Sequence, residues 1–136
     1  MQDDSQIAAS GTWGIVVWAG VSPGSISQAR KFFLELDERD RAKSFKLFQW
    51  LAEFGTIRNP EKFKPLGEHY GPAGRDLFEF KSFQIRFLGD FRPQCRFIIA
   101  LGMRKKKDRH DKSDLEAART ILTAYDALNS VKENAR

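Results

Sequence analysis

Residues 76–101 read DLFEFKSFQIRFLGDFRPQCRFIIAL and contain three strand-like segments in close succession. These segments cover residues 76–81, 84–91 and 96–101 and are rich in β-branched and aromatic side chains. The first segment alternates, so that Phe78 and Phe80 face one side of a strand while Leu77, Glu79 and Lys81 face the other. Because the turns between the segments are short, an antiparallel meander is the simplest arrangement.

The residues before this meander predict one strand and a helical hairpin. Residues 14–19 form a short apolar run that suits a buried strand. Ser25 and Gln28 have the spacing of a capping box, and Asp37 can begin a second helix that ends at Gly55. Apolar side chains recur at helical spacing through both segments, and these are Ala29, Phe32, Phe33, Leu36, Phe45, Leu47, Phe48, Trp50, Leu51 and Phe54.

The flanking segments complete the predicted architecture. Residues 59–74 hold three prolines and three glycines and predict a loop. After the meander, Ser113 and Glu116 form a second candidate capping box before an amphipathic helix. The predicted order is β-α-α-β-β-β-α, an α+β domain whose hairpin packs on one sheet face. We expect a single domain over residues 11–130, a flexible segment at residues 1–10 and a polar tail at residues 131–136.

Composition limits the class of protein. The chain has 136 residues, a net charge of +5 and one cysteine, Cys95. A single cysteine cannot form an internal disulfide, which suits a reducing compartment. Because Cys95 lies in a strand-like stretch, we expect its side chain to be packed. The start lacks a basic secretory signal, and the apolar run at residues 13–21 is about half the length that spans a bilayer. We therefore expect a cytoplasmic protein without a membrane partner. The positive net charge favours a polyanionic partner.

The positive charge gathers where the last strand is predicted to end. Six basic residues and His110 fall within residues 104–112. A junction of strand and helix can direct several cations at one phosphate, aided by the helix N-terminus. Arg86, in the middle strand segment, could join Lys81 and this basic turn on an open sheet face. The alternatives are a solvated charged loop and an Arg86 salt bridge with Glu79 or Asp90.

Motifs for metal or cofactor chemistry are missing from the sequence. His69 and His110, the two histidines, are far apart, and no cysteine pair or HExxH pattern accompanies them. Neither a GxSxG nor a P-loop pattern occurs. We therefore expect neither a metal nor a cofactor.

Three segments carry a family resemblance: LFEFK at residues 77–81, IRFL at residues 85–88 and FIIALGMRKK at residues 97–106. Together they resemble the RelE/ParE toxin superfamily, in its HigB-like, phage-derived branch. Their order and spacing carry the resemblance, which covers residues 60–125 best. It implies a RelE-like fold and a toxin of a type II toxin-antitoxin system. Such a toxin is a metal-independent endoribonuclease that cuts mRNA, usually on the ribosome, through attack of the 2′-hydroxyl on the scissile phosphate.

The resemblance also implies roles for particular residues. Arg86 takes the position of the family's central strand arginine, which binds phosphate, and Arg104 begins its basic cluster. His110 falls where relatives place a general acid or base. We thus expect Arg86, Arg104 and His110 to be catalytic. The residues expected to bind RNA phosphates are Lys62, Lys64, Lys81, Lys105, Lys106, Lys107 and Arg109.

Partners and alternatives follow from the same resemblance. The expected partners are mRNA, the ribosome and a cognate antitoxin protein, which would cover the basic concavity or the helical hairpin with acidic residues. Two other functions stay open: a ParE-like gyrase poison, and a non-catalytic RNA- or protein-binding module whose exposed phenylalanines stack on bases. The nuclease interpretation requires Arg86 and the basic segment from Arg104 to converge over one exposed sheet face.

Overall fold

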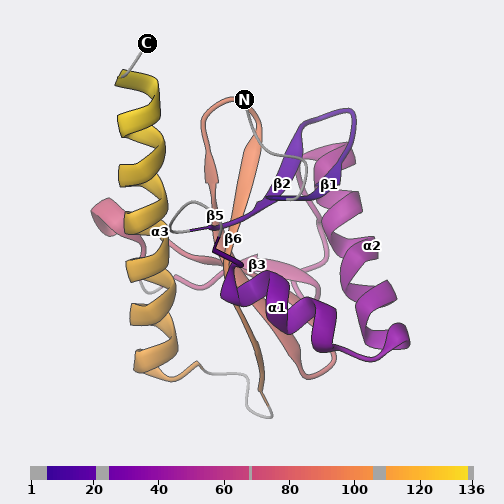
Figure 1. The fold of residues 1–136 in the computed structure, drawn as a ribbon. Helices are drawn as coiled ribbons and strands as arrows, with labels where there is room; N and C mark the ends of the chain where they lie inside the picture. The colour runs from indigo at the N-terminus through magenta and orange to yellow at the C-terminus, as the bar shows by residue number, and fades with distance from the viewer. Residues whose placement is uncertain (1–5, 21–24, 68, 106–109, 135–136) are drawn as a thin grey trace.

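The computed structural model describes residues 6–20, 25–67, 69–105 and 110–134, and it is built as three layers (Figure 1). A six-stranded sheet with the order β1-β2-β6-β5-β4-β3 lies between the pair α1 and α2 and the single helix α3. The strands are β1 (Ile7–Ser10), β2 (Ile15–Trp18), β3 (Phe63–Pro65), β4 (Phe78–Ser82), β5 (Ile85–Arg92) and β6 (Arg96–Arg104). The helices are α1 (Gln28–Glu35), α2 (Glu38–Phe54), α3 (Lys112–Asn134) and a 3₁₀ turn, η2 (Pro72–Gly74).

The sheet confirms the α+β class and the meander and adds two strands. β4, β5 and β6 pair antiparallel in sequence order, while β2 pairs parallel with β6. Strand β1 lies within the segment expected to be flexible, so that expectation is wrong for Ile7–Ser10; residues 1–5 lie outside the described residues. Strand β3 lies within the expected loop at residues 59–74. Both additions are short edge strands, whose backbone groups find partners in β2 and β4.

Helix boundaries show where capping signals are reliable. The Asp37 side chain accepts a hydrogen bond from the Asp40 backbone N–H, and Gly55 ends α2 in the left-handed conformation, as predicted. The first helix begins later than predicted, because Ser27 rather than Ser25 caps it. The second candidate capping box is also wrong: α3 begins at Lys112, so Ser113 already lies inside the helix.

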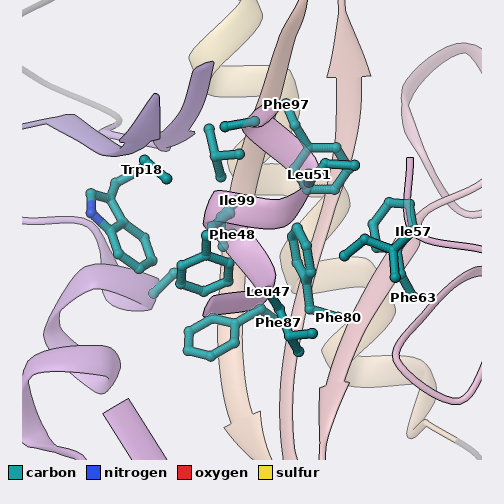
Figure 2. Packing of buried hydrophobic residues seen from close by; sticks show 14 of the residues in the cluster. Trp18, Leu47, Phe48, Leu51, Ile57, Phe63, Phe80, Phe87, Phe97 and Ile99 are labelled. Atoms are coloured by element: carbon teal, nitrogen blue, oxygen red, sulfur yellow. The ribbon is translucent and has the colours of Figure 1, made fainter. Parts of the chain in front are cut away.

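One sheet face packs against α1 and α2 through a core made mostly of aromatic rings (Figure 2). Phe80, Phe87 and Phe97 point from the sheet to this side and are at most 1% exposed. Phe48 of α2 meets Phe80 and Phe87, with ring centroids 5.0 Å apart in both pairs. The sheet phenylalanines are therefore covered, and none of these three can stack on a base.

The opposite sheet face is covered by α3. Leu88, Ile98 and Ala100 of the sheet pack there against Leu115 and Leu122 of the helix. The helix is also held by a two-bond ion pair, in which Arg92 Nε and Nη2 donate to the Asp126 carboxylate at 2.8 and 2.9 Å. Burial alone would lower the pKa of Arg92, but its bonds to Asp126 and Asp90 hold that pKa above its usual value. Both faces of the sheet are thus occupied.

Gly89 lies where the meander leaves no room for a side chain. The pairing of β5 with β6 is irregular between Leu88 and Gly89, and a Cβ at position 89 would lie 2.0 Å from the Ile98 carbonyl oxygen. We expect Gly89→Ala to lower the free energy of unfolding by about 1–3 kcal/mol through overpacking. Urea denaturation measures this, with Gly20→Ala as the control, because a Cβ there meets nothing nearer than 3.8 Å. Equal stability of the two variants would contradict the prediction.

Candidate nucleic-acid interface

Arg86 and Arg104 lie on opposite faces of the sheet, so the predicted convergence of these two side chains is wrong. Arg86 is paired with Met103, and both belong to the face that α3 covers. Arg104 is the next residue of β6 and therefore points to the other face. Its Nη2 atom lies 3.9 Å from Asp40 Oδ2 of α2, and its side chain is 55% exposed.

Several of the predicted phosphate-binding residues do share a face with Arg86. Lys81 is directly opposite Arg86 in the pairing of β4 with β5, and Lys64 is directly opposite Glu79 in the pairing of β3 with β4. Lys62 precedes β3, and its carbonyl oxygen accepts a hydrogen bond from the Lys81 backbone N–H at 2.8 Å. Lys62 is exposed, and Lys64 and Lys81 are half-buried. We call Lys62, Lys64 and Lys81 the basic rim.

Beside the basic rim lie three buried charged or polar side chains from separate parts of the chain. His110 Nε2 is hydrogen-bonded to the Glu79 carboxylate, and Arg86 Nε lies 3.8 Å from the same carboxylate oxygen. The side chains of Glu79, Arg86 and His110 are 1%, 4% and 3% exposed. We call these three residues the buried trio. The alternative that Arg86 pairs with Glu79 is confirmed, whereas Asp90 instead binds Arg75 and Arg92.

The hydrogen bonds of the trio determine which ring nitrogen of His110 is available. A carboxylate only accepts hydrogen bonds, so in the neutral imidazole the proton sits on Nε2 and the lone pair on Nδ1. Among the described residues, His110 Nδ1 and Arg86 Nε have no hydrogen-bond partner although both atoms are buried. Buried polar atoms without partners are rare in folded proteins and often mark functional positions.

The basic segment after β6 contributes less than predicted within the described residues. Lys105 is 14% exposed and forms ion pairs with Asp111 and Asp114 at the start of α3. Its hydrogen bond to Asp114 raises the pKa of Lys105, and burial opposes that effect. Its charge is therefore largely compensated. The expected phosphate ligands Lys106, Lys107 and Arg109 lie outside the described residues.

Two residues, one in the trio and one next to it in the chain fold, are absent from the predicted site. Glu79 connects Arg86 with His110, and the alternation of LFEFK already placed it on the same strand face as Lys81. Phe83 occupies the turn between β4 and β5 and is 83% exposed. The sequence offered a signal for Phe83 too, since a phenylalanine in a two-residue turn has no core to join.

Cys95 also differs from expectation. It lies in the turn between β5 and β6 with a positive φ of 55°, and it is exposed rather than packed. Strand alternation continued through Arg92 to Arg96 would have placed it inward, but the turn interrupts that alternation.

Comparisons with known proteins do not assign a family: no protein-family model matches the chain, and no curated protein matches it. Within the part of the chain that the structure describes, no helix has the length and apolar character needed to cross a membrane. The functional interpretation therefore depends on the site itself and on the resemblance of its sequence segments.

Proposed function

We propose that this protein is the toxin of a type II toxin-antitoxin system and cleaves mRNA without a metal or other cofactor. The observation that carries the proposal is the gathering of the buried trio and the basic rim on one sheet face. Arg86, His110 and the rim lysines are five of the residues that the RelE-like resemblance predicts for the site, and they come from four separate segments. A RelE-like fold, finer than the α+β class, is part of this proposal.

The chemistry assigns each group a task. The 2′-hydroxyl oxygen attacks the adjacent phosphorus, and the bond from phosphorus to the 5′-oxygen breaks to leave a cyclic phosphate. His110 Nδ1 has the lone pair that can take the 2′-hydroxyl proton, while Glu79 holds the ring in that tautomer. Arg86 and the rim lysines stabilise the charge that develops on the phosphate oxygens. The departing 5′-oxygen takes a proton from a rim lysine or from water.

A second candidate, a module that binds RNA without cutting it, is favoured by the burial of the trio. A catalytic group must touch its substrate, yet Arg86 and His110 are almost fully covered in this structure. In this candidate the trio is a structural ion-pair network, and the exposed part of the basic rim does all of the binding. A gyrase poison is the third possibility, and it would leave transcripts intact.

The partner in this proposal is an antitoxin that binds the outer surface of α2. Phe45, Trp50 and Phe54 are between 42% and 65% exposed there. They line a hollow of about 410 Å³ together with Lys46, Gln49 and Glu53. Exposed aromatic side chains of this kind are typical of protein interfaces. Lys46 and the neighbouring Lys43 of the same helix would pair with acidic side chains of the antitoxin.

Induced expression with mapping of transcript 5′ ends tests the nuclease function. We expect growth arrest with new mRNA ends, and we expect His110→Gln to lower cleavage by about 100- to 10,000-fold, the usual contribution of general acid–base catalysis. Glutamine can retain a hydrogen bond to Glu79, so the fold should survive, and the melting temperature checks this. Purified ribosomes with mRNA provide the second assay, because the substrate is expected to be ribosome-bound.

The matched control is His69→Gln, because His69 is 71% exposed and pairs with Asp76, which does not belong to the trio. This variant should cleave like the unchanged protein. Arrest with intact transcripts would rule out the nuclease, and DNA-damage signalling in that case would support the gyrase poison. RNA that binds with steep salt dependence but is never cut, even with ribosomes present, would support the binding module.

A further inference from the structure

Phe83 is the most exposed large apolar side chain among the described residues, and it sits at the tip of the β4–β5 turn. Its residue is 83% exposed, and it makes no ring contact with another described aromatic residue. The turn has only two residues, Phe83 and Gln84, between Ser82 and Ile85. A phenylalanine in this position contributes nothing to either core, so its presence needs another explanation.

The backbone at Phe83 adopts a conformation that disfavours phenylalanine. Its φ is +57°, in the left-handed region, and the first position of such hairpin turns is typically glycine. A non-glycine residue is strained in this conformation. Residues with a strained backbone occur preferentially at functional positions. The turn therefore carries both an exposed aromatic ring and an unfavourable backbone, and glycine would remove both.

Arg86 holds this turn in place from beneath. Its Nη1 atom donates to the Phe83 carbonyl oxygen and, at 3.1 Å, to the Ile85 carbonyl oxygen. The guanidinium is almost fully buried, and the Glu79 carboxylate lies on its other side. The Phe83 backbone is thus fixed by a charged group of the buried trio, which connects the orientation of the tip with the proposed phosphate site.

Cations flank the tip on both sides. On one side, Lys81 of β4 lies two residues before Phe83. The Lys81 backbone N–H donates to the Lys62 carbonyl oxygen, which holds Lys62 beside it. On the other side, the cation is Arg104, which is paired with Ile85 and is 55% exposed. The next residue, Lys105, fixes the end of β6 to the turn, because its backbone N–H donates to the Gln84 carbonyl oxygen at 2.7 Å. Figure 1 shows the end of β6 beside this turn. An aromatic ring between cations has the composition of a site for single-stranded nucleic acid, in which the ring stacks on a base and the cations contact phosphates.

We propose that Phe83 binds RNA by stacking on an unpaired base, while Arg86 acts as a positioning residue that holds the turn. The inference deepens the proposed function by placing a nucleotide next to the phosphate that the trio and rim bind. It requires that the protein binds RNA but not that it cuts RNA. The alternative is that a protein partner covers Phe83. The cations beside Phe83 favour RNA over such a partner.

The test is fluorescence anisotropy with a 5′-labelled single-stranded RNA of about ten nucleotides, within the usual range of site sizes. Its 2′-hydroxyls are methylated, so internal attack cannot consume it. Phe83→Ala should weaken binding about 5- to 150-fold, as expected for loss of one stacked base, whereas Phe83→Trp should retain the affinity. The matched control is Phe54→Ala, which removes a 65% exposed phenylalanine from α2 and should leave RNA binding unchanged.

Phe83→Gly separates stacking from stability. It should lose RNA affinity like Phe83→Ala while the melting temperature stays the same or rises, because glycine accepts the positive φ. Unchanged affinity of Phe83→Ala, or an equal loss in Phe83→Trp, would overturn the inference, as would an effect on a protein partner alone. If RNA binds through Phe83 but is never cut, the nuclease function fails and this inference stands. If transcripts are cut and Phe83→Ala binds normally, only this inference fails.

Discussion

Replacing Glu79 with alanine should lower the free energy of unfolding by about 3–5 kcal/mol, the usual cost of leaving a buried charge without its partner. The carboxylate is 1% exposed and contacts both Arg86 and His110. Its removal leaves the buried Arg86 guanidinium with hydrogen bonds to two carbonyl oxygens and, among the residues that the structure describes, without an ion-pair partner. Urea denaturation at neutral pH measures the loss.

Two further variants show that charge, rather than side-chain volume, causes this loss. Glu79→Gln keeps the shape of the side chain and an acceptor oxygen, so it should lose less stability than the alanine variant. The double variant Glu79→Leu with Arg86→Leu removes both charges and should be more stable than Glu79→Ala alone. Glu61→Ala, at an exposed carboxylate, should leave stability unchanged. If the double variant were less stable than Glu79→Ala, the ion-pair explanation would be wrong.

Phe48→Ala should lower the free energy of unfolding by about 3–5 kcal/mol, because it leaves a cavity between α2 and the sheet. The ring is completely buried and contacts Trp18, Phe80 and Phe87 (Figure 2). It also contacts Phe33 of α1. Four aromatic neighbours cannot all move inward to fill the space. The midpoint of urea unfolding should therefore fall while the slope of the transition stays constant.

The comparison for this variant is Phe45→Ala, one helical turn earlier on the outer surface of α2. Phe45 is 42% exposed, so removal of the same atoms should cost far less stability. The same variant should weaken antitoxin binding if α2 carries that interface. A loss of less than about 1 kcal/mol in Phe48→Ala would mean that the core collapses around the missing ring.

Local patterns in the sequence were sufficient for most of the fold. Alternation in LFEFK correctly separated Phe80 from Glu79, since successive strand residues must face opposite sides. Asp37 and Gly55 marked the limits of α2 because a side-chain acceptor and a left-handed residue satisfy the ends of a helix locally. The short strands β1 and β3 were not predicted. An edge strand forms where a neighbouring strand offers backbone hydrogen-bond partners, and the local sequence of a segment does not show which strand will lie beside it.

The site was predicted in part. Placing Arg86, Lys81 and Lys64 on one face follows from strand pairing, whereas His110 was included only through the family resemblance, and the structure places it against Glu79. The error concerned Arg104, because its face depends on where β6 ends. The strand continues to Arg104 in regular pairing, with Met103 opposite Arg86 and Arg104 opposite Ile85, so the Arg104 side chain alternates away from Arg86.

By itself, the sequence determined the α+β class, the antiparallel meander, the helical hairpin and the residue types available for phosphate chemistry. Those properties depend on periodicity, capping and turn residues, which act over a few positions of the chain. Only the tertiary structure decided that α3 covers the second sheet face, that Glu79 joins Arg86 to His110, and that Phe83 projects from a turn held by Arg86. Each of these depends on groups far apart in sequence, and on the requirement that buried charges find partners wherever packing brings them together.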